Sequence, residues 1–543
     1  MGDATRMLRP VEAMLAILRD EGVSKVFGNP GTSELPFVDA LAAADDIEFV
    51  LGVHEGSVVA MADGYARATG RPAFVSLHIA AGLANGMIGL LNASRSRTPL
   101  VVTAGQQDRR HLASDPMLSG DLVGLARAAV KHTFDVQHAH DLPIMLRRAF
   151  ALAVQPPAGP VFLSIPMDLL QEDAPVAVPA KSVIATPGAP DLTAAVEVLS
   201  SASRPAVVAG DGVGRARAVP SLVALAERLG ATVYHQPMHD GVDFPASHPS
   251  YAGALEPTNQ AIRARLEQHD VVFVVGCHAF MAHHYTPGPA VPPSVRVVQL
   301  DEDPAEIGRN FPVAAGLTGG IQSTLDALTP LLPARPPVTT DLAERRAETG
   351  ARAVRSYGPP PFDPLAAVHA VAAGLSDETV VVEEAITSGV LLRSVLTLDH
   401  PGSLVHTVGG GLGSGIGAAV GTRLADPRRP VVAVLGDGCT LFGLQGLWSA
   451  ARYEVPVTFV VMNNGEYRTL KETLDRWDAG ASRAAGHPAF QLGPPALDFT
   501  RAAEFFGIEA VRPDSLGELT ALVAKSLTGS KPLLVDVPIT AHS

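Results

Sequence analysis

The segment from Gly436 to Asn464 contains residues whose types and order can bind a metal ion and a diphosphate. Gly436-Asp437-Gly438 follows the short apolar run 431–435, and a second β-branched run, 457–462, leads to Asn464. Glycines at a helix start let backbone N–H groups approach an anion, and Mg²⁺ takes carboxylate and amide oxygens. A strand, helix, strand unit brings both strand ends to the carboxyl edge of a parallel sheet. A lone Gly-Asp-Gly is more often a turn, but the complete pattern favours a metal-diphosphate site.

Two other segments contain residues suited to cofactor chemistry. Glu55 ends the strand-like run 51–55, directly before a predicted helix over 56–69. In an apolar pocket its charged form is disfavoured, so it could share a proton with a ring nitrogen; alternatively, it is an ordinary charge at a helix N-terminus. Gly409-Gly410-Gly411-Leu412-Gly413 permits close backbone approach and offers a bulky Leu412. Its alternative interpretation is a flexible loop.

The elements that must position these residues repeat along the chain. Short apolar runs such as 73–77, 205–209 and 379–382 alternate with longer helical patterns, which predicts three doubly wound α/β domains with parallel sheets. Two proline-rich linkers, 174–191 and 330–364, separate them, the second containing a short charged helix. We expect an N-terminal domain over 1–175, a central domain over 190–330 and a C-terminal domain over 362–543.

The central segment contains a glycine-rich motif, Gly210-Asp211-Gly212-Val213-Gly214, after one predicted strand, and an acidic cluster, 301–303, after the strand 295–300. Both features are typical of dinucleotide-binding folds. The cluster lies much further along the chain than the roughly 20 residues of a true fingerprint. We therefore expect a structural, non-binding Rossmann-like domain.

Composition excludes several classes of protein. The 543 residues are too many for one core, and a net charge of −14 argues against a nucleic-acid surface. The two cysteines, Cys277 and Cys439, lack metal spacing, so we expect a reducing compartment and give Cys439 little weight as a nucleophile. No signal-peptide core and no apolar run of membrane-spanning length is present. We expect a soluble, cytoplasmic protein that binds neither nucleic acid nor membrane.

The pattern as a whole resembles the signature of thiamine-diphosphate-dependent enzymes, over essentially the whole chain. The resemblance implies that Asp437, Asn464 and the backbone carbonyl of Glu466 bind Mg²⁺. It also implies that Glu55 lies beside the pyrimidine N1′ of thiamine diphosphate, that the Gly410 carbonyl accepts from the 4′-amino group, and that Leu412 is the wedge that bends the cofactor. The further cofactor contacts that it implies are Gly436, Gly438, Cys439, Tyr467 and Thr387. The central domain of this superfamily binds FAD in some members and nothing in others.

Three loops are similar to those of the benzoylformate decarboxylases: 27–37, 77–82 and 279–285. This similarity implies that His78 and His283, rather than His284, are the two catalytic histidines, and that Thr32 helps to hold the substrate carboxylate. Histidine suits the role because it can donate a hydrogen bond and transfer a proton near neutral pH. A single histidine is more often a surface or core residue, and His283 rests on the resemblance almost entirely.

The sequence also departs from that pattern. Thr32 occupies the place of a serine, His406 and Thr473 stand where the decarboxylases have phenylalanines, and Thr469 replaces an alanine. A polar pocket lining usually implies a polar feature on the ligand. The segment 476–495 is longer than its counterpart, and its Gly, Ala and Pro content is typical of a mobile active-site cover.

We therefore predict a thiamine-diphosphate- and Mg²⁺-dependent, nonoxidative 2-oxo acid decarboxylase, converting an aryl or polar-substituted glyoxylate to an aldehyde and CO₂. One alternative is a carboligase or lyase of the same superfamily, similar to acetolactate synthase or 2-hydroxyacyl-CoA lyase. Another is a non-catalytic paralogue, against which Glu55, Asp437 and Asn464 argue. In the family the acid and the diphosphate loop of one site come from different chains, so the resemblance implies at least a homodimer, with a homotetramer as the usual assembly.

Overall fold

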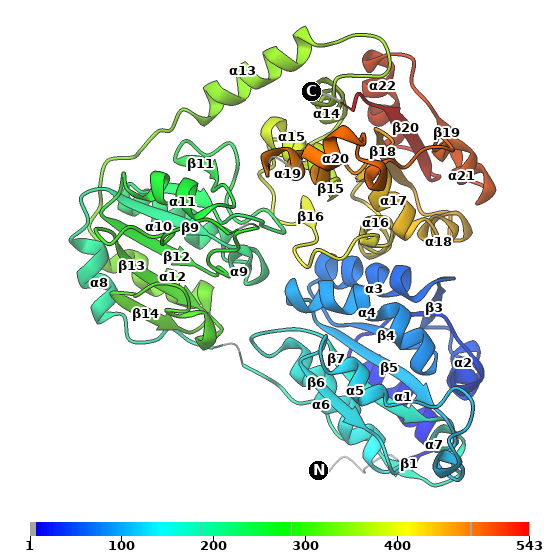
Figure 1. The fold of residues 1–543 in the computed structure, drawn as a ribbon. Helices are drawn as coiled ribbons and strands as arrows, with labels where there is room; N and C mark the ends of the chain where they lie inside the picture. Colours follow the sequence, from blue (N-terminus) through cyan, green and yellow to red (C-terminus); the bar gives the residue numbers. More distant parts are fainter. Residues whose placement is uncertain (1–6, 186, 284, 478–479, 542–543) are drawn as a thin grey trace. The chain divides into compact units, whose positions relative to one another are not determined.

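A computed structural model describes residues 7–185, 187–283, 285–477 and 480–541. The chain forms two compact units, one containing residues 1–184, 356–392 and 409–543, the other residues 185–355 and 393–408. Three six-stranded sheets form their frameworks (Figure 1). The prediction of three doubly wound parallel-sheet domains is confirmed, whereas the domain boundaries at residues 175, 190, 330 and 362 stay predictions.

The N-terminal sheet has the strand order β3-β2-β4-β5-β7-β6, with parallel pairing throughout. β4 and β5 are buried along their whole length, because helices cover both faces of a parallel sheet. The strands are β2 (Lys25–Gly28), β3 (Glu48–Leu51), β4 (Ala73–Leu77), β5 (Leu100–Gln106), β6 (His132–Asp135) and β7 (Val161–Pro166). The helices are α1 (Pro10–Asp20), α2 (Leu35–Ala42), α3 (Glu55–Thr69), α4 (Ile79–Arg95), α5 (Leu122–Ala126), α6 (Asp141–Val154) and α7 (Met167–Gln171).

The C-terminal sheet has the strand order β16-β15-β17-β18-β20-β19. β15, β17, β18, β20 and β19 pair in parallel, so their carboxyl ends share one edge. The strands are β15 (Val380–Glu384), β16 (Leu404–His406), β17 (Val431–Gly436), β18 (Val457–Asn463), β19 (Glu509–Val511) and β20 (Leu533–Pro538). The helices are α14 (Pro364–Ala373), α15 (Ile386–Val395), α16 (Ser414–Ala425), α17 (Asp437–Gly443), α18 (Gly446–Arg452), α19 (Arg468–Arg476), α20 (Gly480–Ala484), α21 (Phe499–Phe505) and α22 (Leu516–Ser526).

Helices α3 and α16 pack against each other at glycines and thereby join the N-terminal and C-terminal sheets within one unit. A β-carbon added at Gly421 would lie 1.8 Å from the Met61 carbonyl oxygen, and one added at Gly64 would lie 2.1 Å from that of Ala418. Only glycine therefore fits at these crossing points without displacing backbone. The contact fixes α3, whose first residue is Glu55, against α16, which follows the glycine-rich segment 409–413.

The central sheet has the strand order β11-β10-β9-β12-β13-β14, all parallel, which is the order of a dinucleotide-binding fold. Its strands are β9 (Pro205–Ala209), β10 (Thr232–His235), β11 (Tyr251–Ala254), β12 (Val271–Val275), β13 (Arg296–Asp301) and β14 (Ala315–Thr318). Its helices are α8 (Thr193–Ser200), α9 (Asp211–Arg215), α10 (Val219–Leu229), α11 (Asn259–Leu266) and α12 (Ile321–Leu328).

The glycines after β9 serve close packing of the backbone. A β-carbon at Gly210 would lie 2.5 Å from the Cys277 sulfur, and one at Gly212 would lie 2.7 Å from the Gly276 α-carbon. The Gly212 N–H donates to the Gly276 carbonyl. The glycine motif thus has a structural explanation that needs no nucleotide.

Both predicted linkers contain short regular elements. The first includes β8 (Val176–Ala177), which pairs antiparallel with β1 (Met7–Leu8), and the second includes α13 (Leu342–Arg355). The charged helix predicted in the second linker is therefore confirmed. None of the helices in the described part of the chain is long and apolar enough to span a bilayer.

Candidate active site

The predicted metal ligands come together where β17 and β18 end. The Asp437 carboxylate accepts hydrogen bonds from the backbone N–H groups of Asn464 (3.0 Å) and Gly465 (2.6 Å). The Asn464 side-chain oxygen accepts from the Glu466 N–H at 3.1 Å. The carboxylate at the start of α17 therefore lies against the short loop after β18 that carries the Asn464 amide and the Glu466 carbonyl, and these oxygen types are the ligands that Mg²⁺ prefers.

The electrostatics at Asp437 suit a cation. The side chain is buried, and burial raises the pKa of its carboxyl although surrounding backbone N–H groups oppose the shift. A bound dication would stabilise the charged form that burial disfavours. Burial also raises the pKa of the neighbouring Cys439 thiol, so this thiol is unsuited to nucleophilic chemistry.

Glu55 is the first residue of α3 and follows the carboxyl end of β3. It is only 6% exposed, and its two oxygens accept hydrogen bonds from Asn29 and Asn85, each at 3.0 Å. The helix-terminal interpretation and the cofactor interpretation both fit this position. The two amide donors hold the carboxyl group in one orientation, which a proton relay to a ring nitrogen requires.

His78 directly precedes α4, and Glu34, which the sequence analysis missed, orients its ring. Nδ1 of His78 lies 2.8 Å from Oε2 of Glu34 and 3.1 Å from the Ser33 hydroxyl. Glu34 is buried and also accepts from the N–H groups of Gly31 and Gly105. Because this carboxylate accepts from two backbone donors, Nδ1 of His78 carries a proton toward it, and Nε2 remains for a substrate.

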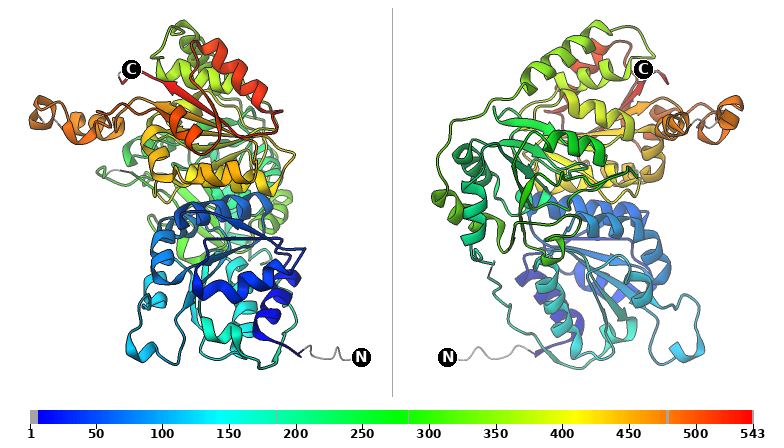
Figure 2. Two further views of the ribbon diagram at one scale, coloured as in Figure 1. Left: turned by 90° about the vertical axis from the view of Figure 1, so that its right-hand side faces the viewer. Right: turned by 60° about the vertical axis from the view of Figure 1, so that its left-hand side comes forward.

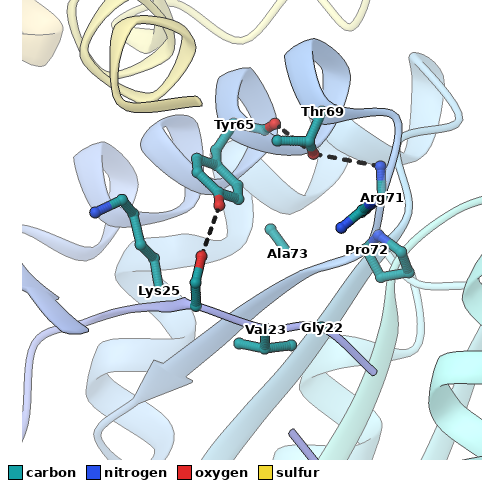
Figure 3. A pocket seen from close by; sticks show the side chains of 9 residues that line it. Gly22, Val23, Lys25, Tyr65, Thr69, Arg71, Pro72 and Ala73 are labelled. Atoms are coloured by element: carbon teal, nitrogen blue, oxygen red, sulfur yellow. Dashed lines mark hydrogen bonds between the residues drawn. The ribbon is translucent and has the colours of Figure 1, made fainter. Parts of the chain in front are cut away.

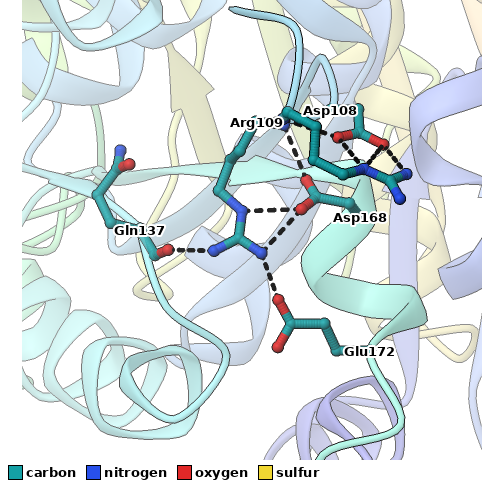
Figure 4. Close-up of polar contacts among 6 residues, drawn as sticks. Asp108, Arg109, Gln137, Asp168 and Glu172 are labelled. Atoms are coloured by element: carbon teal, nitrogen blue, oxygen red, sulfur yellow. Dashed lines mark hydrogen bonds and ion pairs between the residues drawn. The ribbon is translucent and has the colours of Figure 1, made fainter.

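An ion-pair cluster lies just beyond β5, the strand whose Gly105 N–H donates to Glu34. Arg109, just beyond β5, donates from Nε to Asp168 at 2.8 Å and also pairs with Glu172 and the Gln137 carbonyl (Figure 4). These contacts tie the chain after β5 to α7 and to the segment after β6. They lie four residues beyond Gly105, whose N–H donates to Glu34. Arg109 therefore holds together the segments that follow β5, β6 and β7.

The glycine loop, which we define as residues 409–413, presents accessible backbone. Gly410 is exposed with φ +78°, a conformation that L side chains rarely adopt, and Leu412 is half-buried. Of the other predicted cofactor residues, Tyr467 lies over Gly438, where a β-carbon would come 2.6 Å from its ring. Thr387 lies with its hydroxyl 3.4 Å from that of Thr469.

The remaining predicted residues include Thr32, His283 and Thr473. Thr32 is exposed, and the hydroxyl that contacts His78 belongs to its neighbour Ser33. His283 is an exposed residue of the central unit, so its catalytic role stays a prediction, and His284 lies outside the described residues. The Thr473 hydroxyl donates to the Thr469 carbonyl within α19. Its polarity is therefore satisfied internally and does not require a polar ligand.

His406, at the end of β16, is half-buried, and its backbone N–H donates to the Asp240 carbonyl at 3.2 Å within the central unit. Its predicted place in a substrate pocket stays a prediction.

The segment 476–495, predicted to cover the site, is hydrogen-bonded to the loop after β18 that contains Asn464 and Glu466. The Tyr467 N–H donates to the Phe490 carbonyl and the Leu492 N–H donates to the Gly465 carbonyl, both at 2.8 Å. Between these points α20, drawn in orange, extends away from the C-terminal sheet in both views of Figure 2. Residues 478–479 lie outside the described part. The segment is thus hydrogen-bonded to Gly465 and Tyr467, the two neighbours of Glu466, whose carbonyl is the predicted metal ligand.

A cavity of about 240 Å³ in the N-terminal sheet lies apart from this chemistry (Figure 3). Its lining comes from the start of β2, the start of β4 and the end of α3, including Lys25, Tyr65 and Arg71. Glu55 and His78 follow the carboxyl ends of strands in the same sheet, which is the opposite edge. The cavity is therefore not part of the candidate site.

Comparison with known proteins agrees with this geometry. Residues 9–144 match the family "Thiamine pyrophosphate enzyme, N-terminal TPP binding domain", residues 192–328 match its central domain, and residues 387–537 match its C-terminal TPP binding domain. The chain belongs to the thiamine pyrophosphate enzyme family. The recognition made from the sequence motifs is confirmed, and the two TPP-binding domains indicate thiamine diphosphate as the cofactor of this enzyme.

Relatives of this thiamine-diphosphate-dependent enzyme catalyse more than one reaction. It is 37% identical to benzoylformate decarboxylase of Pseudomonas aeruginosa, over 97% of this chain and 98% of that one. It is 29% identical to the acetolactate synthase large subunit of Haemophilus influenzae, over 98% and 95%. A solved structure of a Rhodococcus jostii thiamine diphosphate-dependent 4-hydroxybenzoylformate decarboxylase superposes with a TM-score of 0.88 at 32% identity, covering 98% of this chain and 99% of that one.

Proposed function

We propose that this enzyme is a nonoxidative decarboxylase of a 2-oxo acid, an aryl glyoxylate similar to benzoylformate, which it converts to an aldehyde and CO₂. The observation that carries the proposal is the Glu34–His78 pair, which lies at the same edge of the N-terminal sheet as Glu55. A decarboxylase must return a proton to the carbon that loses CO₂, and a histidine with an oriented, free Nε2 is suited to that step.

The cofactor, when bound, supplies the nucleophilic carbon and accepts the electrons that CO₂ leaves behind. The residues of the chain bind and orient it. Asp437, Asn464 and the Glu466 carbonyl would hold Mg²⁺, and the start of α17 with Gly436, Gly438 and Cys439 would face the diphosphate. Glu55 would exchange a proton with the pyrimidine ring, Thr32 would contact the substrate carboxylate, and His283 would be a second proton donor.

Two relatives bear on the substrate. One is named for benzoylformate and one for its 4-hydroxy derivative. The Thr469 hydroxyl lies at the start of α19, which follows β18, 3.4 Å from the hydroxyl of the predicted cofactor residue Thr387. A polar substituent on the aromatic ring would find a hydrogen-bond partner in the Thr469 hydroxyl. We therefore propose an aryl glyoxylate with a polar ring substituent.

The alternative is a carboligase or lyase, favoured by the similarity to the acetolactate synthase large subunit over nearly the whole chain. Both reactions need the same bound cofactor. They differ in whether a proton or a second carbonyl compound meets the activated carbon, so the product separates them.

CO₂ release from benzoylformate and from 4-hydroxybenzoylformate, with thiamine diphosphate and Mg²⁺, tests the proposal, and Glu55→Gln is the control. We expect aldehyde and CO₂ in equal amounts from the wild type, with loss of about 10²-fold or more in the variant. Formation of acetolactate from pyruvate, without aldehyde from either aryl acid, would favour the carboligase. Proven failure to bind thiamine diphosphate would favour a non-catalytic paralogue.

A further inference from the structure

The glycine loop is held from two sides by buried polar side chains that lie far from it in sequence. Asn92, in α4 of the N-terminal sheet, is 2% exposed, and Glu384, at the end of β15, is 7% exposed. Their hydrogen bonds reach the backbone on both sides of Leu412. Neither side chain belongs to the residues assigned above to the cofactor or the substrate.

The Asn92 side chain both accepts a hydrogen bond from the Gly411 backbone and donates one to it. Its side-chain oxygen accepts from the Gly411 N–H at 3.0 Å, and its amide nitrogen donates to the Gly411 carbonyl at 2.8 Å and to the Ser414 hydroxyl at 2.6 Å. A backbone N–H can only donate and a carbonyl can only accept, and the amide side chain, which has both an acceptor and a donor, satisfies both. An aspartate or an apolar residue would leave buried groups without a partner.

Asn92 also explains two of the glycines. A β-carbon at Gly409 would lie 2.4 Å from the Asn92 side-chain oxygen, and one at Gly411 would lie 2.8 Å from it. The loop therefore lies directly on this amide. Helix α4 begins after His78, so the same helix presents the histidine at one end and supports the glycine loop near the other.

Glu384 fixes the other end of the loop. One oxygen accepts from the N–H groups of Gly413 (2.8 Å) and Ser414 (3.0 Å), and the other accepts from that of Gly415 at 2.9 Å. Three donors at the start of α16 thus converge on a single carboxyl group. Asn92 thus holds Gly411 directly, Glu384 holds Gly413, and Leu412 lies between these two supported residues.

We propose that Asn92 and Glu384 are positioning residues that set the backbone of Gly410 to Leu412 in the geometry that the cofactor needs. This inference rests on the proposed cofactor contacts of Gly410 and Leu412. The physical reason is preorganisation: a loop already held in its bound geometry spends no binding energy on ordering, and a misplacement of about 1 Å can lower a rate about 10²-fold. The diphosphate would be held elsewhere, through Mg²⁺ at Asp437, so loss of a support should disturb activation of the cofactor more than its affinity.

The test uses the full chain with Asn92→Ala, Asn92→Asp and Glu384→Gln, and Thr103→Val as the matched control. Thr103 is also buried and donates to a carbonyl, that of Val75, within the N-terminal sheet. Two readouts need no substrate: amide hydrogen exchange of the peptide 409–415 in the cofactor-free protein, and the rate of hydrogen–deuterium exchange at C2 of bound thiamine diphosphate. Calorimetric titration with thiamine diphosphate and Mg²⁺ gives the affinity.

We expect amide exchange of the loop to be about tenfold faster in Asn92→Ala and Glu384→Gln, and C2 exchange to be about 10²-fold slower, with affinity changed less than about tenfold. Asn92→Asp keeps the acceptor for the Gly411 N–H, so both exchange rates of this variant should lie between those of the wild type and those of Asn92→Ala. If Asn92→Ala fails to fold, Ser414→Ala, which removes one of its bonds, gives a smaller change in the same direction.

C2 exchange within about threefold of wild type in both Asn92→Ala and Glu384→Gln would overturn the proposal, as would unchanged amide exchange of the loop. These outcomes are separable from the proposed reaction. A wild type that exchanges the C2 proton and releases no CO₂ from any 2-oxo acid would contradict the decarboxylase, while the comparison of variants would still decide the role of Asn92 and Glu384.

Discussion

Oε2 of Glu34 lies 2.8 Å from Nδ1 of His78, and Gly31 packs so closely on the imidazole that a β-carbon there would lie 2.2 Å from Nδ1. The ring is thus fixed by a charge on one edge and by backbone on one face. This pair gives the chain a histidine of defined tautomer.

Replacing Glu34 with glutamine should therefore lower kcat by about 10–100-fold, because Nδ1 loses its carboxylate acceptor and the ring can adopt the other tautomer. The pH dependence of kcat should shift as well, which a loss of packing alone would not cause. Steady-state decarboxylation between pH 5 and 9 measures both. Glu48→Gln, which removes an exposed partner of Lys25, is the control. A kcat within twofold of wild type would contradict the pair's role.

Asp437→Asn should abolish the dependence of cofactor binding on Mg²⁺ and weaken thiamine diphosphate binding by about 10²-fold or more, because a neutral amide cannot balance the dication. Titration calorimetry with and without Mg²⁺ measures this. In the wild type, removal of the metal with a chelator should lower the melting temperature through loss of bound ligand. Glu472→Gln, on α19, should change neither quantity. Mg²⁺-dependent binding that persists in Asp437→Asn would refute the metal assignment.

Mixing two inactive variants tests whether sites form between chains. Glu55→Gln and Asp437→Asn each lack one half of the proposed site. If the halves come from different chains of a dimer, unfolding and refolding an equal mixture should restore about a quarter of wild-type activity, since half of the dimers are mixed and each has one intact site. Each variant refolded alone is the control. No recovery, although mixed dimers are detected by mass spectrometry, would place both halves in one chain.

Gly421→Ala should destabilise the unit that holds both cofactor-facing sheet edges. The added methyl group would lie 1.8 Å from the Met61 carbonyl oxygen, so α3 and α16 must separate. We expect a loss of roughly 3 kcal/mol, at the upper end of overpacking, seen as a lower urea midpoint. Gly517→Ala on α22, where the nearest atom is 4.0 Å away, should instead raise stability by up to about 1 kcal/mol. Equal effects of the two changes would contradict the close crossing.

Because His239 in the central unit is buried, we expect the free energy of unfolding to fall at acid pH. Burial lowers the pKa of His239 to about 3, with Arg393 adding to the shift. The unfolded chain, with a histidine pKa near ~6.5, binds one more proton between these values, so stability falls as pH falls from about 6.5 toward 3. The slope from this residue is at most ~1.4 kcal/mol per pH unit. His239→Asn should make the measured slope shallower, and exposed His140→Asn should not. Equal slopes in all three proteins would exclude this linkage.

The sequence predicts what depends on neighbours along the chain. The run 457–462 is observed as β18 (Val457–Asn463) and the helix 56–69 as α3, because burial of parallel strands and helix periodicity leave local patterns. The close approach of Asp437 to Asn464 follows for the same reason, since strand ends in a parallel sheet share an edge. Glu34 and Asn92 were missed because their partners, Gly105 and Gly411, lie far away in sequence. The glycines at 210–214 are a different case: the sequence motif fits either nucleotide binding or close packing, and the fold shows that Gly210 and Gly212 pack closely on Cys277 and Gly276.

The amide of Asn92 lies 319 residues before the loop that it supports. The three sheets look like separable modules. However, this contact and the crossing of α3 with α16 mean that the conformation of the glycine loop in the C-terminal module also depends on residues of the N-terminal module. A chimaera that joins residues 356–543 to the first half of a relative will inherit a well-formed loop only where that relative supplies an amide at the same place on its helix. We therefore expect recombinants within the family to keep a well-formed loop when α4 and residues 409–415 come from the same parent.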